Sequence, residues 1–331
     1  MWVPHPKFFA RFAKNLGWVS FVTLSIIPLR GSQNSILHAA PNLPFLVYIQ
    51  GKVAFHPNPV SAPHNPVSEP SAPVEPQFQL TPAPIPPPIE DPPWTGWDVV
   101  ALAFITFFTV VACIFATAYL AHVRFSPSTP WLESLKRPEV IVVGQLLAYV
   151  FILILMYKVV RNHSDGRVSE SIRWNWPPNW TLYLLGGVTL AIFLLPLGNL
   201  LPMPKEVPID EFFRTARDAY ILSLFGILFA PLFEELLFRG FLYPVVARRF
   251  GLYPSIVLTS LAFASIHASQ LKYSWGPVLI IFLVGIALTT VRALKKSVAA
   301  TVLMHMAYNG TIFIATYIAT DRFRHMERFN R

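Results

Sequence analysis

Two adjacent glutamates, Glu234 and Glu235, and the arginine Arg239 lie within one long apolar run of this sequence. Ionisable side chains inside a membrane helix are costly, roughly 2.5–3.5 kcal/mol each on insertion scales, and therefore usually serve a function. Glu235 and Arg239 have the favourable spacing of four residues, with the glutamate first. We expect them to pair along one helix face, where mutual contact would compensate both buried charges and make that region rigid.

Glu234 must point in another direction, because adjacent residues of a helix lie about 100° apart. We expect its carboxylate to face a cavity, where a desolvated carboxylate is suited to proton transfer. The alternative is that all three charged residues form an interhelical clamp. That alternative is stronger for Glu235 and Arg239 than for Glu234, since one arginine does not require two carboxylates.

Two histidines mark the apolar runs that follow. Phe263 and His267 are four residues apart, as are His305 and Asn309. His305 and Asn309 share one face of a helix and could present two hydrogen-bonding groups to one point. Histidine transfers protons near neutral pH and also binds metals. A single buried histidine is more often a satisfied core residue, but two histidines, a glutamate and an asparagine on three successive helices favour an active site.

The composition identifies the elements that must position these groups. Hydrophobic residues make up 54% of the 331 residues and charged residues 13%, about half the charged fraction of an ordinary soluble domain. The net charge of +9 comes from short basic clusters between apolar runs, a pattern that is typical of membrane loops and argues against a nucleic-acid partner. The single cysteine, Cys113, excludes an intramolecular disulfide framework.

The predicted fold class is all-α, a polytopic membrane helix bundle of about seven to eight transmembrane helices. A helix needs about 20 residues to cross the hydrocarbon, and its backbone groups must be satisfied within the helix. Residues 202–218 are predicted to be a loop that leads into an amphipathic or re-entrant piece. The apolar runs after Trp94 span residues 97–121, 140–160, 180–201, 219–247, 254–268, 276–293 and 298–319.

Four regions divide the chain. Residues 1–50 combine basic residues with a short apolar stretch, a pattern of a signal peptide or of an uncleaved anchor. Residues 51–93 are rich in proline, which lacks the backbone donor that helices and sheets need, so we expect a disordered, solvated linker. Residues 94–322 contain the membrane runs with their polar groups, and residues 323–331 form a basic tail.

The polar groups resemble the motifs of the CAAX-protease and bacteriocin-processing family, also called CPBP or Abi. That family is marked by EExxxR on one membrane helix, FxxxH on the next and HxxxN on a later one. The resemblance covers roughly residues 97–320 and implies an intramembrane protease domain over residues 94–322. We expect such a multi-pass protein in the plasma membrane of a bacterium. The three motifs read here Glu234-Glu235-Leu-Leu-Phe-Arg239, Phe263-Ala-Ser-Ile-His267 and His305-Met-Ala-Tyr-Asn309.

The resemblance implies a hydrolytic endopeptidase and a role for each motif residue. Glu234 would be the general base that activates water, with His267 assisting. His305 and Asn309 would orient the substrate carbonyl and stabilise the tetrahedral oxyanion, a task for prepositioned donors. The remaining pair, Glu235 and Arg239, would hold the helix in place.

The participation of a metal is left open. Glu234, His267 and His305 could supply the three protein ligands of a divalent metal such as zinc. Glu235 would then be the only nearby base. We favour a mechanism without a metal or other cofactor, because it uses each motif residue once.

The expected partners are the lipid bilayer and a peptide or lipidated protein substrate. Eukaryotic relatives remove the last three residues after a prenylated cysteine, whereas others are linked to bacteriocin self-immunity or peptide maturation. Two non-catalytic functions could use the same buried Glu and His residues, namely an ion-coupled transporter and a membrane immunity or scaffold protein. The sequence lacks the internal repeat that many transporters show.

Overall fold

The computed structural model describes residues 90–204 and 212–325, which belong to one compact unit. The expected segment 1–50, nearly all of the expected linker 51–93 and the end of the basic tail lie outside the described residues. Within the described ranges the regular structure is entirely helical. Residues 201–204, at the start of the predicted loop, are irregular, and α7 begins at Ala216 after the undescribed residues 205–211.

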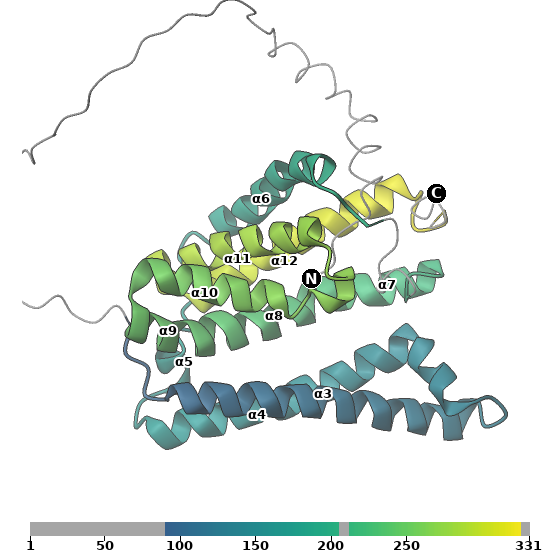
Figure 1. The fold of residues 1–331 in the computed structure, drawn as a ribbon, viewed down its shortest axis with the longest axis horizontal. Helices are drawn as coiled ribbons and strands as arrows, with labels where there is room; N and C mark the ends of the chain where they lie inside the picture. The colour runs from purple at the N-terminus through teal and green to yellow at the C-terminus, as the bar shows by residue number, and fades with distance from the viewer. Residues whose placement is uncertain (1–89, 205–211, 326–331) are drawn as a thin grey trace, which may run out of the picture. The chain divides into compact units, whose positions relative to one another are not determined.

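All seven apolar runs are helices, which confirms the predicted polytopic bundle (Figure 1). Six helical segments of the described chain are long and apolar enough to cross a membrane, and α10 is a shorter apolar helix of 14 residues. The long helices are α3 (Gly96–Phe125), α4 (Pro138–His163), α6 (Trp180–Leu200), the run from α7 to α9 (Ala216–Phe250), α11 (Trp275–Lys295) and α12 (Val298–Ala319), and α10 spans Leu252–Ser265. Short helices span Trp131–Lys136, Val168–Ser171 and Ser269–Leu271.

The first membrane helix begins where its sequence supplies a cap. The Thr95 hydroxyl accepts a hydrogen bond from the backbone N–H of Asp98, and the Asp98 carboxylate accepts one from the backbone N–H of Thr95 at 2.7 Å. This reciprocal arrangement satisfies donors that the helix itself cannot pair. Asp98 therefore caps the start of α3.

The helices differ in how far they are enclosed. In the most apolar 18-residue stretch of α3 only 6% of the residues are buried inside the protein, against 61% in the corresponding stretch of α12. Helix α6 packs against α12, and α10 packs against α11. Gly187 permits the first contact, because it lies directly against the Met304 carbonyl and leaves no room for a β-carbon. The buried helix α12 therefore carries His305 and Asn309 into the centre of the bundle.

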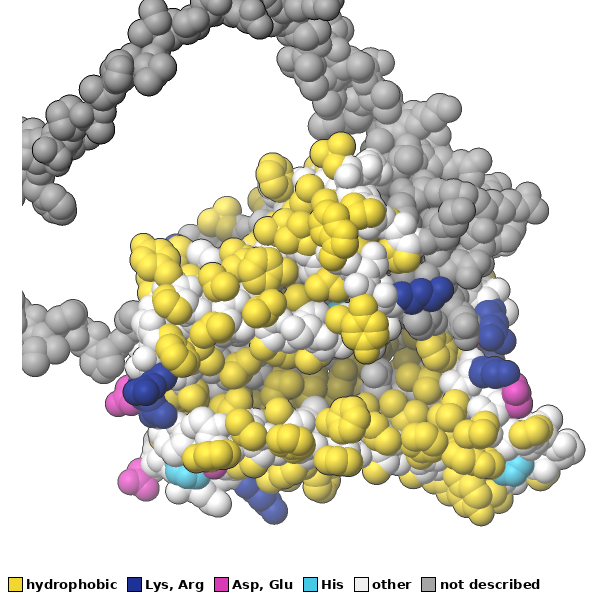
Figure 2. All heavy atoms as spheres, in the orientation of Figure 1, with side chains coloured by type: hydrophobic (Ala, Val, Ile, Leu, Met, Phe, Trp, Pro, Cys, Tyr) yellow, Lys and Arg dark blue, Asp and Glu magenta, His cyan; other side chains and the backbone are white. Residues whose placement is uncertain are grey.

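Hydrophobic side chains cover the visible face of the described residues, and charged side chains gather near the ends of the helices (Figure 2). Large exposed side chains such as Phe104, Phe107 and Phe108 on α3 would be a liability in water. In a bilayer they contact hydrocarbon at no cost. The protein is an integral membrane protein that crosses the bilayer several times.

Two π-helical turns interrupt the long segment from α7 to α9. After α7 (Ala216–Leu224) come η3 (Phe225–Phe229) and α8 (Ala230–Glu235), and these are followed by η4 (Leu236–Leu242) and α9 (Tyr243–Phe250). Proline stands at the second position of both α8 and α9. A proline inside a helix has no N–H for the preceding turn, and its ring displaces that turn. Short π-helical insertions often lie at functional sites, and here Glu234, the predicted catalytic base, and its neighbour Glu235 lie between the two insertions.

Candidate active site

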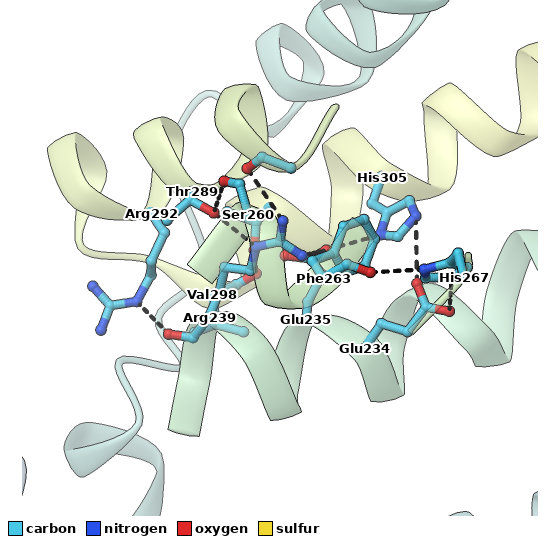
Figure 3. Close-up of polar contacts among 12 residues, drawn as sticks. Glu234, Glu235, Arg239, Ser260, Phe263, His267, Thr289, Arg292, Val298 and His305 are labelled. Carbon is cyan, nitrogen blue, oxygen red and sulfur yellow. Dashed lines mark hydrogen bonds and ion pairs between the residues drawn. The ribbon is translucent and has the colours of Figure 1, made fainter. Parts of the chain in front are cut away.

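Glu234 and Glu235 end helix α8 and point towards different neighbours (Figure 3). Glu235 is 0% exposed and Glu234 is 8% exposed. Both carboxylates are therefore removed from bulk solvent. In such a buried position an uncompensated charge would be strongly destabilising. The predicted divergence of the two side chains is confirmed.

Glu235 joins Arg239 to His305. Its Oε1 accepts a hydrogen bond from the Arg239 guanidinium at 2.8 Å and lies 2.8 Å from Nδ1 of His305. The predicted pairing of Glu235 with Arg239 is thereby confirmed, whereas the contact with His305 was not predicted. An ionised carboxylate can only accept, so Nδ1 of His305 carries the proton and Nε2 is directed elsewhere.

Arg239 is itself held by two further helices. Its Nε donates to Thr289 Oγ1 and another guanidinium nitrogen donates to the Gly285 carbonyl, both at 3.2 Å on α11. The guanidinium carbon lies 4.4 Å from the ring centre of Phe263 on α10. A planar guanidinium presents several donors in a fixed geometry. Arg239 therefore connects Glu235 to α10 and α11 in one defined position.

Glu234 lies between the two histidines. Its Oε1 is 3.8 Å from Nε2 of His267, and its Oε2 is 3.8 Å from Nε2 of His305. His267 Nδ1 lies 2.8 Å from the backbone carbonyl of Phe263. A carbonyl can only accept, so this nitrogen also carries a proton. Both histidines thus hold Nδ1–H away from Glu234 and direct Nε2 towards it.

The same contacts explain the spacing of Phe263 and His267. His267 lies just past the end of α10, and its imidazole turns back one turn to the Phe263 carbonyl. The Phe263 ring centre is 5.1 Å from that of His267 and 5.9 Å from that of His305. One phenylalanine therefore fixes one imidazole by its backbone and packs against both by its ring.

Asn309 faces another element. Its Nδ2 donates to the Gly226 carbonyl in η3 at 2.7 Å, and its buried Oδ1 accepts no hydrogen bond from the described residues. His305, one turn earlier on α12, is directed to the two glutamates. The structure therefore does not bring these two side chains to one point, and a direct role for Asn309 at a substrate carbonyl stays a prediction.

The hypothetical metal ligands Glu234, His267 and His305 converge. However, within residues 90–204 and 212–325 no set of three His, Cys, Asp or Glu side chains has the arrangement of a metal site. A cavity of about 650 Å³ adjoins Leu232 and Leu236 on the same helical segment, and Glu234 is not part of its lining.

Two residues of this region were missed in the sequence. Arg292 on α11 is 0% exposed, and its Nε donates to the backbone carbonyl of Arg239 at 3.0 Å. Another guanidinium nitrogen of Arg292 donates to Glu90 at 2.7 Å. The rule that singled out Glu234, a charged residue within an apolar run, applies equally to Arg292. No comparable signal marks Glu90, which lies near the end of the proline-rich segment.

Residues 216–311 match the family model of Rce1-like proteins, described as type II CAAX prenyl endopeptidases. This part of the chain is similar to an Rce1-like domain. This match contains all three motifs and confirms the resemblance found in the sequence. At the level of the family it supports a peptidase of the CAAX type that acts within the membrane.

A protein of Escherichia coli, described as an uncharacterized 24.3 kDa protein, is similar to this chain. The two are 28% identical over 167 residues, which cover 49% of this chain and 74% of the other protein. No solved structure matches the chain at a significant level. The similarity to Rce1-like proteins therefore rests on the family model over residues 216–311 and on the motif residues of the site.

Proposed function

We propose that this protein is an intramembrane endopeptidase of a bacterial plasma membrane in which Glu234 activates a water molecule. Its substrates would be membrane-associated peptides or lipidated proteins, with C-terminal processing of the CAAX type as the first candidate. One observation carries the proposal. Two histidines, one just past the end of α10 and one on α12, direct their Nε2 atoms to the two oxygens of a single buried carboxylate.

The distance of 3.8 Å between each Nε2 and Glu234 is too long for a direct hydrogen bond. Polar groups at such a separation are suited to a bridging water. A water held between Glu234 and His267 can transfer one proton to the carboxylate while its oxygen attacks the substrate carbonyl. This placement supports the proposed general-base role of Glu234 and the proposed assisting role of His267.

His305 is the proposed donor to the oxyanion. Because its Nδ1–H is committed to Glu235, its Nε2 can donate only from the doubly protonated imidazolium. Two carboxylates and the Arg239 guanidinium leave one net negative charge in this buried cluster. An imidazolium at His305 neutralises that charge, and burial favours a neutral cluster. The oxyanion of the tetrahedral intermediate then forms beside a fixed positive donor.

Collapse of the intermediate completes the reaction. The carbon–nitrogen bond breaks, and the proton held by Glu234 passes to the departing amine, which restores the carboxylate. Asn309 is better suited to a positioning role in this scheme than to direct contact, since its amide holds the Gly226 carbonyl. Water, both peptide products and the resting state of Glu234 are accounted for without a cofactor.

The experiment uses detergent-purified full-length protein with a prenylated CAAX peptide and a library of unprenylated peptides. Wild type is compared with Glu234→Gln and His267→Ala, each with and without a zinc chelator. We expect cleavage to fall by at least about a hundredfold in both variants and the chelator to have no effect. Cleavage that survives Glu234→Gln would overturn the role of Glu234, and loss of cleavage on chelation would overturn the metal-free mechanism.

The same assay tests the non-catalytic alternatives. A folded wild type that cleaves no peptide of either set would overturn the peptidase proposal in favour of an immunity or scaffold protein. Ion flux into proteoliposomes that is changed by Glu234→Gln, in the absence of any cleavage, would instead indicate a transporter.

A further inference from the structure

A second buried arginine, Arg292, connects the helix that carries the glutamates to the segment before α3. One guanidinium nitrogen of Arg292 donates to Glu90, and its Nε donates to the Arg239 carbonyl. Arg292 is 0% exposed and Glu90 is 5% exposed. The two residues are 202 positions apart in the chain. They lie outside the three motifs, and Glu90 lies outside the matched residues 216–311.

The Arg239 carbonyl needs this donor because of the local helix geometry. The backbone N–H of Tyr243, which would normally bond to Arg239, bonds instead to the Phe238 carbonyl in the π-helical turn. The next residue is Pro244, which has no N–H. The Arg239 carbonyl is therefore left without its helical partner, and a buried carbonyl without a donor is destabilising. Arg292 supplies that donor (Figure 3).

Glu90 makes the burial of Arg292 possible. A guanidinium in this environment is strongly unfavourable unless a carboxylate compensates it. The carboxylate of Glu90 provides the compensating negative charge, and the guanidinium carbon of Arg292 also lies 5.2 Å from the ring centre of Tyr243. Arg173 approaches the other oxygen of Glu90 at 3.9 Å from the exposed side. The carboxylate thus has a buried partner and a peripheral one.

The segment that carries Glu90 is fixed by further contacts with η4 and α9. The Trp94 indole donates to the Phe241 carbonyl at 2.9 Å and stacks on the Phe241 ring with centres 4.9 Å apart. Arg248 on α9 donates to the carbonyls of Pro92 and Trp94. Arg292 hydrogen-bonds both to this segment and to the backbone of Arg239, whereas the hydrogen bonds of Arg248 go to this segment. Arg248 is therefore the matched control.

We infer that Glu90 and Arg292 are positioning residues of the active site. Arg292 fixes the η4 turn at the carbonyl of Arg239. The Arg239 side chain in turn holds Glu235, and Glu235 holds the imidazole of His305. Glu90 compensates the buried charge of Arg292 and holds its guanidinium in place. This inference rests on the proposed peptidase function, because the quantity that it controls is the geometry of the catalytic step.

Four variants of the full-length protein separate positioning from general stability: Arg292→Gln, Arg292→Lys, the double variant Arg292→Gln/Pro244→Ala, and the control Arg248→Gln. We expect Arg292→Gln to lower kcat by about 10- to 100-fold with little change in KM, as is typical when a supporting contact of an active site is removed. Arg292→Lys retains the charge and should lose less. The change Pro244→Ala supplies a backbone N–H beside the Arg239 carbonyl and should restore part of kcat. Arg248→Gln should leave kcat within about twofold of wild type.

An unchanged kcat in folded Arg292→Gln protein, or an equal loss of kcat in Arg248→Gln, would overturn the inference while leaving the proposed peptidase intact. A thermal unfolding cycle of Glu90→Gln, Arg292→Gln and the double variant needs no activity. Each single change should lower the unfolding midpoint on the order of 5 °C or more, and the double variant should lose clearly less than the two losses combined. If the wild type cleaves no peptide, the proposed function fails. Independently of activity, additive losses of stability in the unfolding cycle would show that Glu90 and Arg292 are not coupled, and would overturn the inference.

Discussion

The two π-helical turns between α7 and α9 are built alike but completed differently. In η3 the backbone N–H of Ala230 bonds to the Phe225 carbonyl, and the next residue, Pro231, has no N–H. The Gly226 carbonyl therefore lacks a helical donor and accepts one from Asn309. In η4 the same arrangement leaves a carbonyl without a helical donor at Arg239, and there Arg292 supplies the donor.

The difference lies in the charge of the donor. Asn309 is neutral and can be buried with one hydrogen bond made, although its own Oδ1 stays unsatisfied among the described residues. Arg292 brings a full charge, so η4 also requires Glu90 from the segment before α3. A neutral donor ties one turn to one helix, whereas a charged donor makes the turn depend on a third element. We therefore expect that removing the side-chain donor of η4 lowers the free energy of unfolding more than removing the side-chain donor of η3.

The largest loss of stability is expected from Arg239→Met, which removes the tie between η4 and α11 and leaves η3 unchanged. Glu235 would keep a buried carboxylate without its guanidinium, and breaking a buried pair in this way costs about 3–5 kcal/mol. Equilibrium unfolding in mixed micelles measures the loss. The double variant Glu235→Gln/Arg239→Met is the control and should lose less than Arg239→Met alone. Equal losses would show that the pair is not electrostatically coupled.

A direct comparison of the two turns uses Arg292→Leu and Asn309→Leu. The first leaves both the Arg239 carbonyl and Glu90 without their buried donor, with an expected loss of about 3 kcal/mol or more in the free energy of unfolding. The second removes one hydrogen bond between helices, worth about 1–2 kcal/mol in a membrane. Both are measured by the same unfolding assay. A larger loss for Asn309→Leu would contradict the sensitivity assigned to η4.

A restored backbone N–H at η3 tests whether Pro231 is the reason that the Gly226 carbonyl lacks a helical donor. In the background of Asn309→Leu, the change Pro231→Ala supplies an N–H that can reach the Gly226 carbonyl, and should recover about 1 kcal/mol. Pro244→Ala in the same background is the matched control and should recover nothing, because it acts on the other turn. Equal recovery by both substitutions would indicate a general effect of removing proline from the helix.

Local patterns predicted most of what the structure confirms. Each apolar run had the length of a helix, so all seven were found, and the pairing of Glu235 with Arg239 follows from their spacing within one helix. Pro231 and Pro244 also signal local disturbance, although the sequence does not say which carbonyls are left without a donor. The sequence did not predict the contacts between residues that are far apart in the chain. His305 meets Glu235 across 70 positions and Arg292 meets Glu90 across 202, and no local period specifies such contacts.

The direct role of Asn309 shows the same limit. Its spacing from His305 places both side chains on one face of α12, and the sequence therefore suggested a common target. The structure gives them different neighbours, since His305 meets two glutamates and Asn309 meets the backbone of η3. Sharing a helix face fixes direction to within a broad sector only. The neighbouring helix decides which atoms are reached.

The smallest effect is expected when Pro231→Ala and Pro244→Ala are made separately in the wild-type chain. Each carbonyl already has a side-chain donor, so a new N–H competes for a filled position and the free energy of unfolding should change by less than about 1 kcal/mol. Unfolding in mixed micelles checks both variants. A gain of more than about 2 kcal/mol from either would mean that the prolines hold the helix in strain that Asn309 and Arg292 do not relieve. A small change at both positions, together with rescue in the Asn309→Leu background, would establish that each π-helical turn is completed from outside its own helix.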